Sequence, residues 1–141
     1  MLTMLHAGPT IPILLALALA FTHWVGDFKF QSNWMALNKG KNTVEGAKAL
    51  IQHCFVYACC FAWVSIEFAW ITFALHLLTD AVTSRVNSKL WFVKAELVSD
   101  GPYAVPALVF DDSKRHWFFV SIGFDQYVHT ACLLGTYWWL S

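Results

Sequence analysis

Three pairs of histidine and aspartate, each four residues apart, stand inside strongly apolar stretches of the chain: His23 and Asp27, His76 and Asp80, and, in reverse order, Asp125 and His129. A spacing of four places both side chains of a pair on one face of a helix. Imidazole and carboxylate groups are common ligands for zinc and similar divalent metals. Because ionisable groups inside a membrane are costly and usually functional, three such pairs predict an intramembrane metal site.

The composition is typical of a small integral membrane protein. Of the 141 residues, 58% are hydrophobic and 13% are charged. We expect one domain, residues 1–141, folded as an all-α bundle of four transmembrane helices at about 11–30, 45–66, 68–86 and 116–140. The polar segment 31–43 is typical of a loop, and the mixed segment 87–115 is typical of an interfacial stretch with a short amphipathic helix. The zero formal net charge argues against a nucleic-acid partner.

The positive charges indicate an orientation in the membrane. All nine Lys and Arg residues flank the first or the third loop, and the second loop and both termini contain none. The positive-inside rule therefore places loops one and three in the cytoplasm and both termini outside. The residues concerned are Lys29, Lys39, Lys41, Lys48, Arg85, Lys89, Lys94, Lys114 and Arg115.

With this topology, seven ligand-type side chains from four helices fall in the cytoplasmic half of the membrane. A catalytic zinc takes about three protein ligands plus water, so seven exceed the need of one ion. Two ions bridged by a carboxylate would use all seven and would suit phosphoester hydrolysis. One ion with outer carboxylates that orient the imidazoles is the alternative, and the sequence leaves both open. The seven are His23, Asp27, His53, His76, Asp80, Asp125 and His129.

Two other interpretations account for the same residues. A His–Asp pair can neutralise itself, and a histidine inside a membrane often serves as a hydrogen-bond partner between helices. A chain of imidazoles and carboxylates can also conduct protons. The matched depth of the three pairs and His53 favours the metal site over both.

Polar and basic residues near the cytoplasmic ends of the helices are candidates for substrate binding. Gln31 follows Asp27 by four residues and continues the same helix face. Four basic side chains could bind phosphate head groups there, although ordinary flanking charge is the simpler explanation for any one of them. Arg85, five residues after Asp80, is the strongest of these candidates, which are Lys29, Lys39, Arg85 and Lys89.

Three stretches resemble a family of bacterial and phage membrane proteins known as domain of unknown function 3307. They are His23–Ala36 with Asn38 and Lys39, then His76–Asp80 with Ser84 and Arg85, and finally Asp125–His129. His53 falls where the family has a histidine in its second span. The resemblance covers nearly the whole chain and implies a small multi-pass protein of the bacterial inner membrane. Its H-x-x-x-D pattern is similar to that of inner-membrane metal-dependent hydrolases.

These observations lead to one main hypothesis, a membrane-embedded, metal-dependent hydrolase that acts from the cytoplasmic side on a lipid or phosphoester-type substrate. The four histidines would ligate one or two divalent ions, preferably zinc, while Asp27, Asp80 and Asp125 ligate, bridge or act as base toward a metal-bound water. Membrane lipids are the expected partners. The alternatives are a non-catalytic subunit of a homo-oligomer or larger membrane assembly with a structural metal or polar cluster, and a proton or metal-ion conductor.

Overall fold

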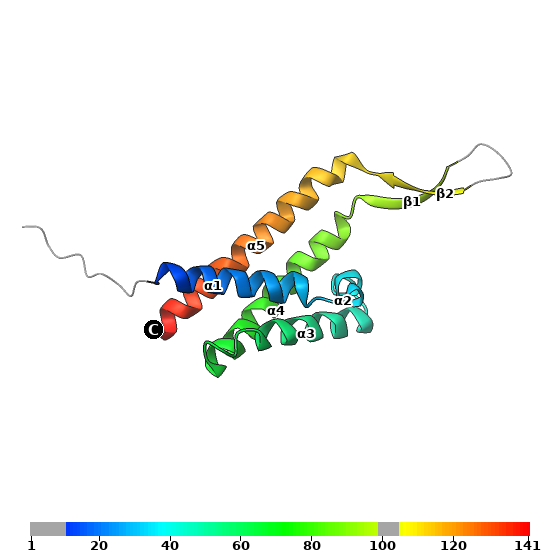
Figure 1. Cartoon of the computed structure of the whole chain (residues 1–141). Helices are drawn as coiled ribbons and strands as arrows, with labels where there is room; N and C mark the ends of the chain where they lie inside the picture. Colours follow the sequence, from blue (N-terminus) through cyan, green and yellow to red (C-terminus); the bar gives the residue numbers. More distant parts are fainter. Residues whose placement is uncertain (1–10, 99–104) are drawn as a thin grey trace, which may run out of the picture.

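Five α-helices, one π-turn and one β-hairpin make up the part of the chain that the computed structural model describes, residues 11–98 and 105–141 (Figure 1). The mostly helical architecture predicted from the sequence is confirmed. In chain order the elements are α1 (Ile13–Trp24), the π-turn η1 (Val25–Lys29), α2 (Asn33–Asn38), α3 (Val44–Cys59), α4 (Ile66–Lys89), β1 (Val93–Val98), β2 (Val105–Phe110) and α5 (Asp112–Leu140).

Hydroxyl side chains fix the starts of three helices. Ser32 accepts a hydrogen bond from the Met35 N–H at the start of α2, and Thr43 accepts one from the Gly46 N–H at the start of α3. Ser65 accepts one from the Phe68 N–H at the start of α4. Each cap satisfies one of the backbone donors that a helix leaves without an intrahelical partner.

Helix α4 is central to the bundle, because it packs against both α3 and α5. Helix α1 packs against α5, and η1 packs against α3. Short helix α2 lies near the N-terminal end of α3 and the C-terminal end of α1, and α4 and α5 continue past this end of the bundle into the hairpin (Figure 1). We call this the α2 end of the bundle. The turn between α3 and α4 lies at the opposite end, the turn end (Figure 1).

Apolar side chains cover the outside of the bundle as well as part of its interior. Near the turn end, a buried cluster consists of Leu19, Tyr57, Phe61, Phe68 and Leu133. On the outside, large apolar side chains remain exposed on every long helix, including Leu14 of α1 at 78%, Leu78 of α4 at 67% and Trp139 of α5 at 72%. Exposed apolar side chains in this number are typical of a surface that contacts lipid or other proteins.

Among the described residues, α4 alone is long and apolar enough to cross a membrane, judged by length and hydropathy. Its 24 residues span about 36 Å at 1.5 Å per residue. Helices α1 and α3 have 12 and 16 residues, and each is shorter than the roughly 20 residues that cross a hydrocarbon core. By this criterion the structure supports one span, where the sequence predicted four.

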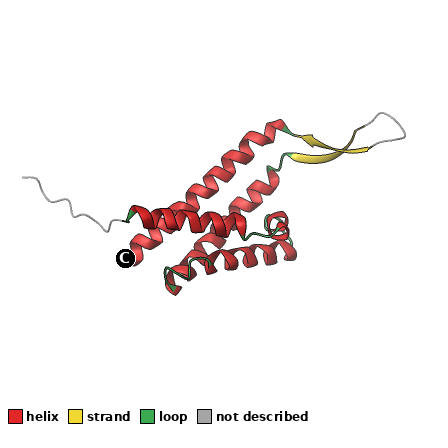
Figure 2. Cartoon of the chain, viewed as in Figure 1, coloured by secondary structure: helices red, strands yellow, loops and turns green. Residues whose placement is uncertain are grey.

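The segment between α4 and α5 differs from the sequence prediction. Instead of a short amphipathic helix, β1 and β2 form an antiparallel hairpin that extends from the α2 end away from the helices (Figure 2). Val93 pairs with Phe110, and the Asp111 N–H donates to the Phe92 carbonyl, which joins the hairpin to both helices. The β-branched valines on both strands favour an extended backbone. This preference outweighs the mixture of polar and apolar residues from which an amphipathic helix was predicted.

The helices differ from the sequence prediction in two places. The polar segment 31–43, predicted as a loop or surface segment, contains α2, because the Ser32 side chain caps a helix there. The second predicted helix ends at Cys59 rather than Ile66, since residues 60–64 form tighter turns with bonds such as Phe61 N–H to the Ala58 carbonyl. The first helical segment lies within the predicted range 11–30, and its last turn is the π-turn η1.

Candidate metal centre

The seven histidines and aspartates singled out in the sequence lie together inside the bundle, and all are buried. They come from α1, η1, α3, α4 and α5, which converge between the apolar cluster and the α2 end. They form three overlapping groups whose ligand atoms lie within 4.8 Å of one another. The groups are Asp27, His53, His76 and Asp80; His23, Asp27 and His129; and Asp80, Asp125 and His129.

The first group, which we call the cage, has the geometry of a four-coordinate metal site. His53 Nε2 lies 3.1 Å from Asp27 Oδ1, 3.1 Å from His76 Nε2 and 3.4 Å from Asp80 Oδ2. His76 Nε2 lies 3.7 Å from each of the same two carboxylate oxygens. A tetrahedron with metal–ligand bonds of about 2.0–2.1 Å has edges of about 3.3–3.4 Å. Four such atoms can therefore surround one zinc-sized ion after shifts of a few tenths of an ångström.

The two cage histidines direct only one nitrogen each to a polar partner. His53 Nε2 and His76 Nε2 face one another, whereas the Nδ1 atoms of both rings are buried and find no hydrogen-bond partner within residues 11–98 and 105–141. The His76 ring is held in place by stacking, with Tyr57 at 3.7 Å on one side and His129 at 4.1 Å between centroids. The rings are thus fixed so that both Nε2 atoms meet at the cage.

Close packing of η1 against α3 depends on the small size of Gly26. A Cβ on Gly26 would lie 3.0 Å from Cδ2 of Tyr57, so a larger residue would press against the ring that stacks on His76. The π-turn carries Gly26 and Asp27 together on the buried side of the helix. π-turns of this kind occur frequently at functional sites.

Hydrogen bonds connect the cage to the remaining residues of the cluster. His23 bonds Tyr57 Oη through Nδ1 and Gln126 Oε1 through Nε2, each at 2.8 Å. The Gln126 amide donates to Asp27 Oδ2 at 2.8 Å and to Asp125 Oδ2 at 3.1 Å. Gln126 therefore holds Asp27 and Asp125 in fixed positions, and His23 is an outer partner rather than a corner of the cage.

Asp125 and His129 lie on the other side of Asp80. The Thr83 hydroxyl donates to Asp125 Oδ1 at 2.5 Å. His129 Nδ1 lies 3.6 Å from Asp125 Oδ2, and His129 Nε2 lies 3.5 Å from Asp80 Oδ1. Both nitrogens of His129 are buried, and neither has a hydrogen-bond partner among the residues that the structure describes.

A lysine from the segment after α2 reaches the cage oxygens. Lys39 Nζ lies 2.8 Å from Asp80 Oδ2 and 3.9 Å from Asp27 Oδ1. Burial alone would lower the pKa of Lys39, but the carboxylates of Asp80 and Asp27 outweigh that effect and raise it. The side chain therefore carries a full positive charge at neutral pH.

The charges of the cluster do not balance. If the imidazoles are neutral and the carboxylates of Asp27, Asp80 and Asp125 are all ionised, the three negative charges and the positive charge of Lys39 give a net charge of −2. An unbalanced charge in a low-dielectric interior is costly. One divalent cation would bring the cluster to neutrality, whereas two would leave it at +2.

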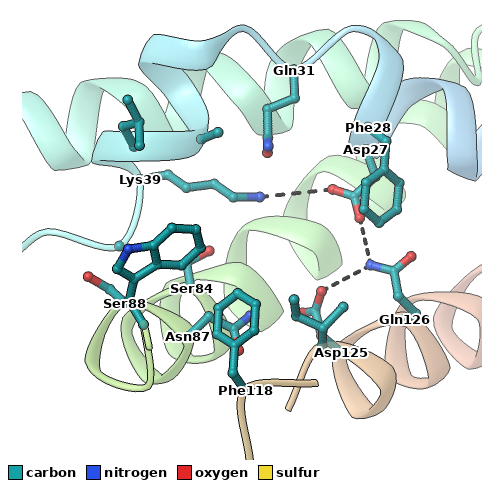
Figure 3. A pocket seen from close by; sticks show the side chains of 15 residues that line it. Asp27, Phe28, Gln31, Lys39, Ser84, Asn87, Ser88, Phe118, Asp125 and Gln126 are labelled. Carbon is teal, nitrogen blue, oxygen red and sulfur yellow. Dashed lines mark hydrogen bonds and ion pairs between the residues drawn. The ribbon is translucent and has the colours of Figure 1, made fainter. Parts of the chain in front are cut away.

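A cavity of about 380 Å³ opens beside the cluster toward the α2 end (Figure 3). Asp27, Lys39, Asp125 and Gln126 form its polar wall next to the cage. The lining also includes the apolar side chains of Phe28, Ala36, Leu37, Trp91, Phe118 and Ile122. The volume lies within the range of small-molecule sites, and the mixed lining suits a ligand with a polar and an apolar part.

The residues predicted to bind substrate occupy different places. Gln31 lines the cavity, and its Oε1 atom is buried without a hydrogen-bond partner. Arg85 donates to the Asn42 side chain at 2.6 Å and to the Ala81 carbonyl, and it does not line the cavity. Lys29 is exposed and likewise lies outside the cavity wall. A role of Arg85 or Lys29 in substrate binding stays a prediction.

Sequence reasoning did not single out two residues that position the cluster. Tyr57 stands four residues after His53, so the helical spacing that identified the His–Asp pairs also marks it. Thr83 stands three residues after Asp80 on α4, but a threonine at this spacing carries no specific signal. Its role depends on contact with α5, which only the folded chain provides.

Comparison with known proteins identifies the family of the chain. The family described as Protein of unknown function (DUF3307) matches residues 13–141, which include all seven residues of the cluster. The chain therefore belongs to this family, as its three sequence blocks predicted. Searches of curated proteins and of solved structures found no match.

Proposed function

We propose that this DUF3307 protein is a metal-dependent hydrolase embedded in the bacterial inner membrane, acting from the cytoplasmic side on a lipid or phosphoester-type substrate. The cage carries the proposal, because two imidazole nitrogens and two carboxylate oxygens lie 3.1–3.7 Å apart along five of their six edges. A single zinc ion is the favoured occupant, since it neutralises the net charge of the cluster.

The cavity supports hydrolysis rather than simple metal storage. Asp27 belongs both to the cage and to the cavity wall, so a bound ion would lie directly beside a substrate in the cavity. Such an ion lowers the pKa of a bound water to about 7 and polarises an ester or phosphoryl oxygen. In this scheme His53, His76 and Asp80 ligate, while Asp27 is the corner that can loosen toward the cavity.

Asp125 is the favoured general base. It lies in the cavity wall, and the hydrogen bonds from Thr83 and Gln126 fix its carboxylate beside Asp27. In this position Asp125 could accept a proton from a water molecule that attacks a substrate in the cavity. His129 Nδ1 lies 3.6 Å from the same carboxylate and could help to position it.

The exterior of the bundle supports the membrane location. Large side chains such as Leu14, Phe21 and Trp70 are more than 60% exposed, while histidines and aspartates fill much of the interior. This distribution suits a lipid environment better than water, where exposed apolar surface of this extent leads to association. The segments that carry the nine basic residues gather at the α2 end and beside it, which supports a cytoplasmic α2 end (Figure 1).

Metal content provides the first test. Protein purified in a non-ionic detergent without chelators should contain about one zinc per chain, measured by elemental analysis. His76→Ala should lose the metal but keep its helical circular dichroism, while His116→Ala, which changes an exposed histidine away from the cluster, should keep both. Wild-type protein without metal would contradict the proposal.

A closed structural site in a non-catalytic membrane subunit is the second candidate. It is favoured by the number of corners, because four protein ligands complete a tetrahedron and leave no position for water. The variant Asp125→Asn separates the two functions, since Asp125 lies outside the cage. A hydrolase should keep its zinc and lose turnover of phosphoester substrates, whereas a structural site should keep its zinc and show no turnover in either form.

A further inference from the structure

Lys39 contacts the same two oxygen atoms that form the carboxylate corners of the cage. Its ammonium lies 2.8 Å from Asp80 Oδ2 and 3.9 Å from Asp27 Oδ1. The next residue holds the backbone in place, because a Cβ on Gly40 would overlap the Ser84 carbonyl oxygen of α4. The lysine is thus positioned against α4 by close backbone packing rather than by a flexible loop.

A divalent ion in the cage would compete with this ammonium. The ion would take its bonds from Asp80 Oδ2 and Asp27 Oδ1, and these are the atoms that neutralise Lys39. Two cations that share these oxygens repel each other strongly in a region of low dielectric constant. Binding of the ion therefore weakens the ion pair of Lys39 and favours a different position of its ammonium.

The cavity offers that position. Lys39 lines it, and the amide oxygens Gln31 Oε1 and Asn87 Oδ1, which belong to residues lining the same cavity, are buried without hydrogen-bond partners. In Figure 3 the side chain of Gln31 points into the cavity between Lys39 and Asp27. An ammonium that leaves the cage thus has acceptors nearby, and three N–H donors with which to use them.

We propose, on the basis of the metal site above, that Lys39 is the cation of the empty cage, and that a divalent ion displaces it into the cavity, where it binds the phosphate group of the ligand. With the ion bound, the ammonium is no longer neutralised by Asp80 and Asp27, so it can pair with an anion in the cavity. The apolar side chains of Phe28, Trp91 and Phe118 in the lining suit a phosphate attached to an acyl chain.

Zinc affinity tests the competition. We compare wild type, Lys39→Met and Lys41→Met by competition with a chromophoric chelator in non-ionic detergent. Lys41 is the matched control, because it lies in the same segment but, among the described residues, bonds the side chain of Asn38 at 2.9 Å and no carboxylate of the cage. Lys39→Met should bind zinc at least 10-fold more tightly than wild type, and Lys41→Met should match wild type. Equal or weaker zinc binding by Lys39→Met would overturn the inference.

Phosphate affinity tests the second role. Zinc-loaded wild type should bind inorganic phosphate and a short-chain phosphatidic acid, and zinc-loaded Lys39→Met should bind both at least 10-fold more weakly. The zinc-loaded variant retains a neutralising cation, so this comparison holds even where the metal-free variant does not fold. Tighter binding of the lipid than of phosphate supports a lipid ligand, whereas equal binding assigns the site to free phosphate.

The two proposals fail in different ways. Zinc binding by all three proteins with no effect of Lys39→Met on zinc or phosphate would overturn only the role of Lys39. Absence of zinc binding from all three would overturn both the role of Lys39 and the metal-dependent function.

Discussion

Toward the turn end, the space between the helices is filled by Leu19, Phe61, Phe68 and Leu133, whereas nearer the α2 end the same helices contribute histidines and aspartates. The apolar part needs no ligand, because its side chains only have to pack. The polar part has a net negative charge and four unpartnered ring nitrogens, so it is incomplete without a cation or protons.

This difference indicates a division of labour. The apolar part sets the positions of the helices, and the polar part uses those positions to bring ligand atoms from different helices to one point. Tyr57 belongs to both, since its ring packs on Phe61 while its hydroxyl bonds His23. Variants on either side should therefore affect different properties of the protein.

The largest effect should follow from a cavity in the apolar part. Phe61→Ala should lower the free energy of unfolding by about 3–5 kcal/mol, because Phe61 is fully buried. Unfolding curves in mixed micelles measure the loss of stability. Elemental analysis of the folded variant should still find one zinc per chain. Phe55→Ala is the control, as Phe55 lies on α3, six residues before Phe61, and is 52% exposed. Loss of zinc from folded Phe61→Ala would break the proposed division.

A change in the polar part should have the opposite profile. Asp80→Asn removes the charge that contacts Lys39, His53 and His129, and it should weaken zinc binding by at least about 100-fold. Helical circular dichroism should be retained, because the apolar cluster is unchanged. Asp112→Asn, with a side chain 73% exposed, should bind zinc as wild type does. Collapse of the helices in Asp80→Asn would instead indicate a structural metal site.

A change at Tyr57, which contacts both the apolar part and the polar part, should have a smaller effect on stability and on zinc affinity. Tyr57→Phe keeps the ring but removes the hydroxyl that bonds His23, so stability should fall by about 1–2 kcal/mol. Zinc affinity should fall by roughly 10-fold, because His23 and Gln126 then position Asp27 less firmly. Tyr127→Phe, at a side chain that is 69% exposed, should change neither value.

The smallest effect should follow from a helix cap outside both parts. Thr43→Ala removes the bond to the Gly46 N–H and should lower stability by about 1 kcal/mol without changing zinc affinity. Thr43→Ser, which retains a hydroxyl, should recover most of the loss. A change in zinc affinity of Thr43→Ala would contradict this expectation, because it would show that the start of α3 affects metal binding in the cage.

Local spacing made part of the site predictable. The four-residue intervals of the three pairs depend only on helix geometry, so the sequence identified all seven residues that the fold brings together. It could not tell which of them form the cage. His76 and Asp80 are both corners, whereas His23, at the same interval from Asp27, bonds Tyr57 and Gln126 instead. That distinction depends on distances between helices.

Other features escaped prediction because they depend on long-range contacts. The ion pair of Lys39 with Asp80 joins residues 41 apart, and the close packing of Gly40 on Ser84 that positions it leaves no local pattern. The hairpin was read as helical because apolar and polar residues are mixed in residues 87–115, and pairing of the two strands decides the outcome. The helices were easier to recognise, since apolar periodicity and caps are local.

The π-turn has a consequence for how this segment can change in evolution. It accommodates one residue more than an α-helical turn, as the bond from the Phe30 N–H to the Val25 carbonyl shows. Deletion of a single codon within it would restore α-helical winding with little net rotation of α1, because the wider turn already absorbs the extra residue. One in-frame deletion could thus remove the turn that carries Gly26 and Asp27 on the buried side while α1 keeps its packing.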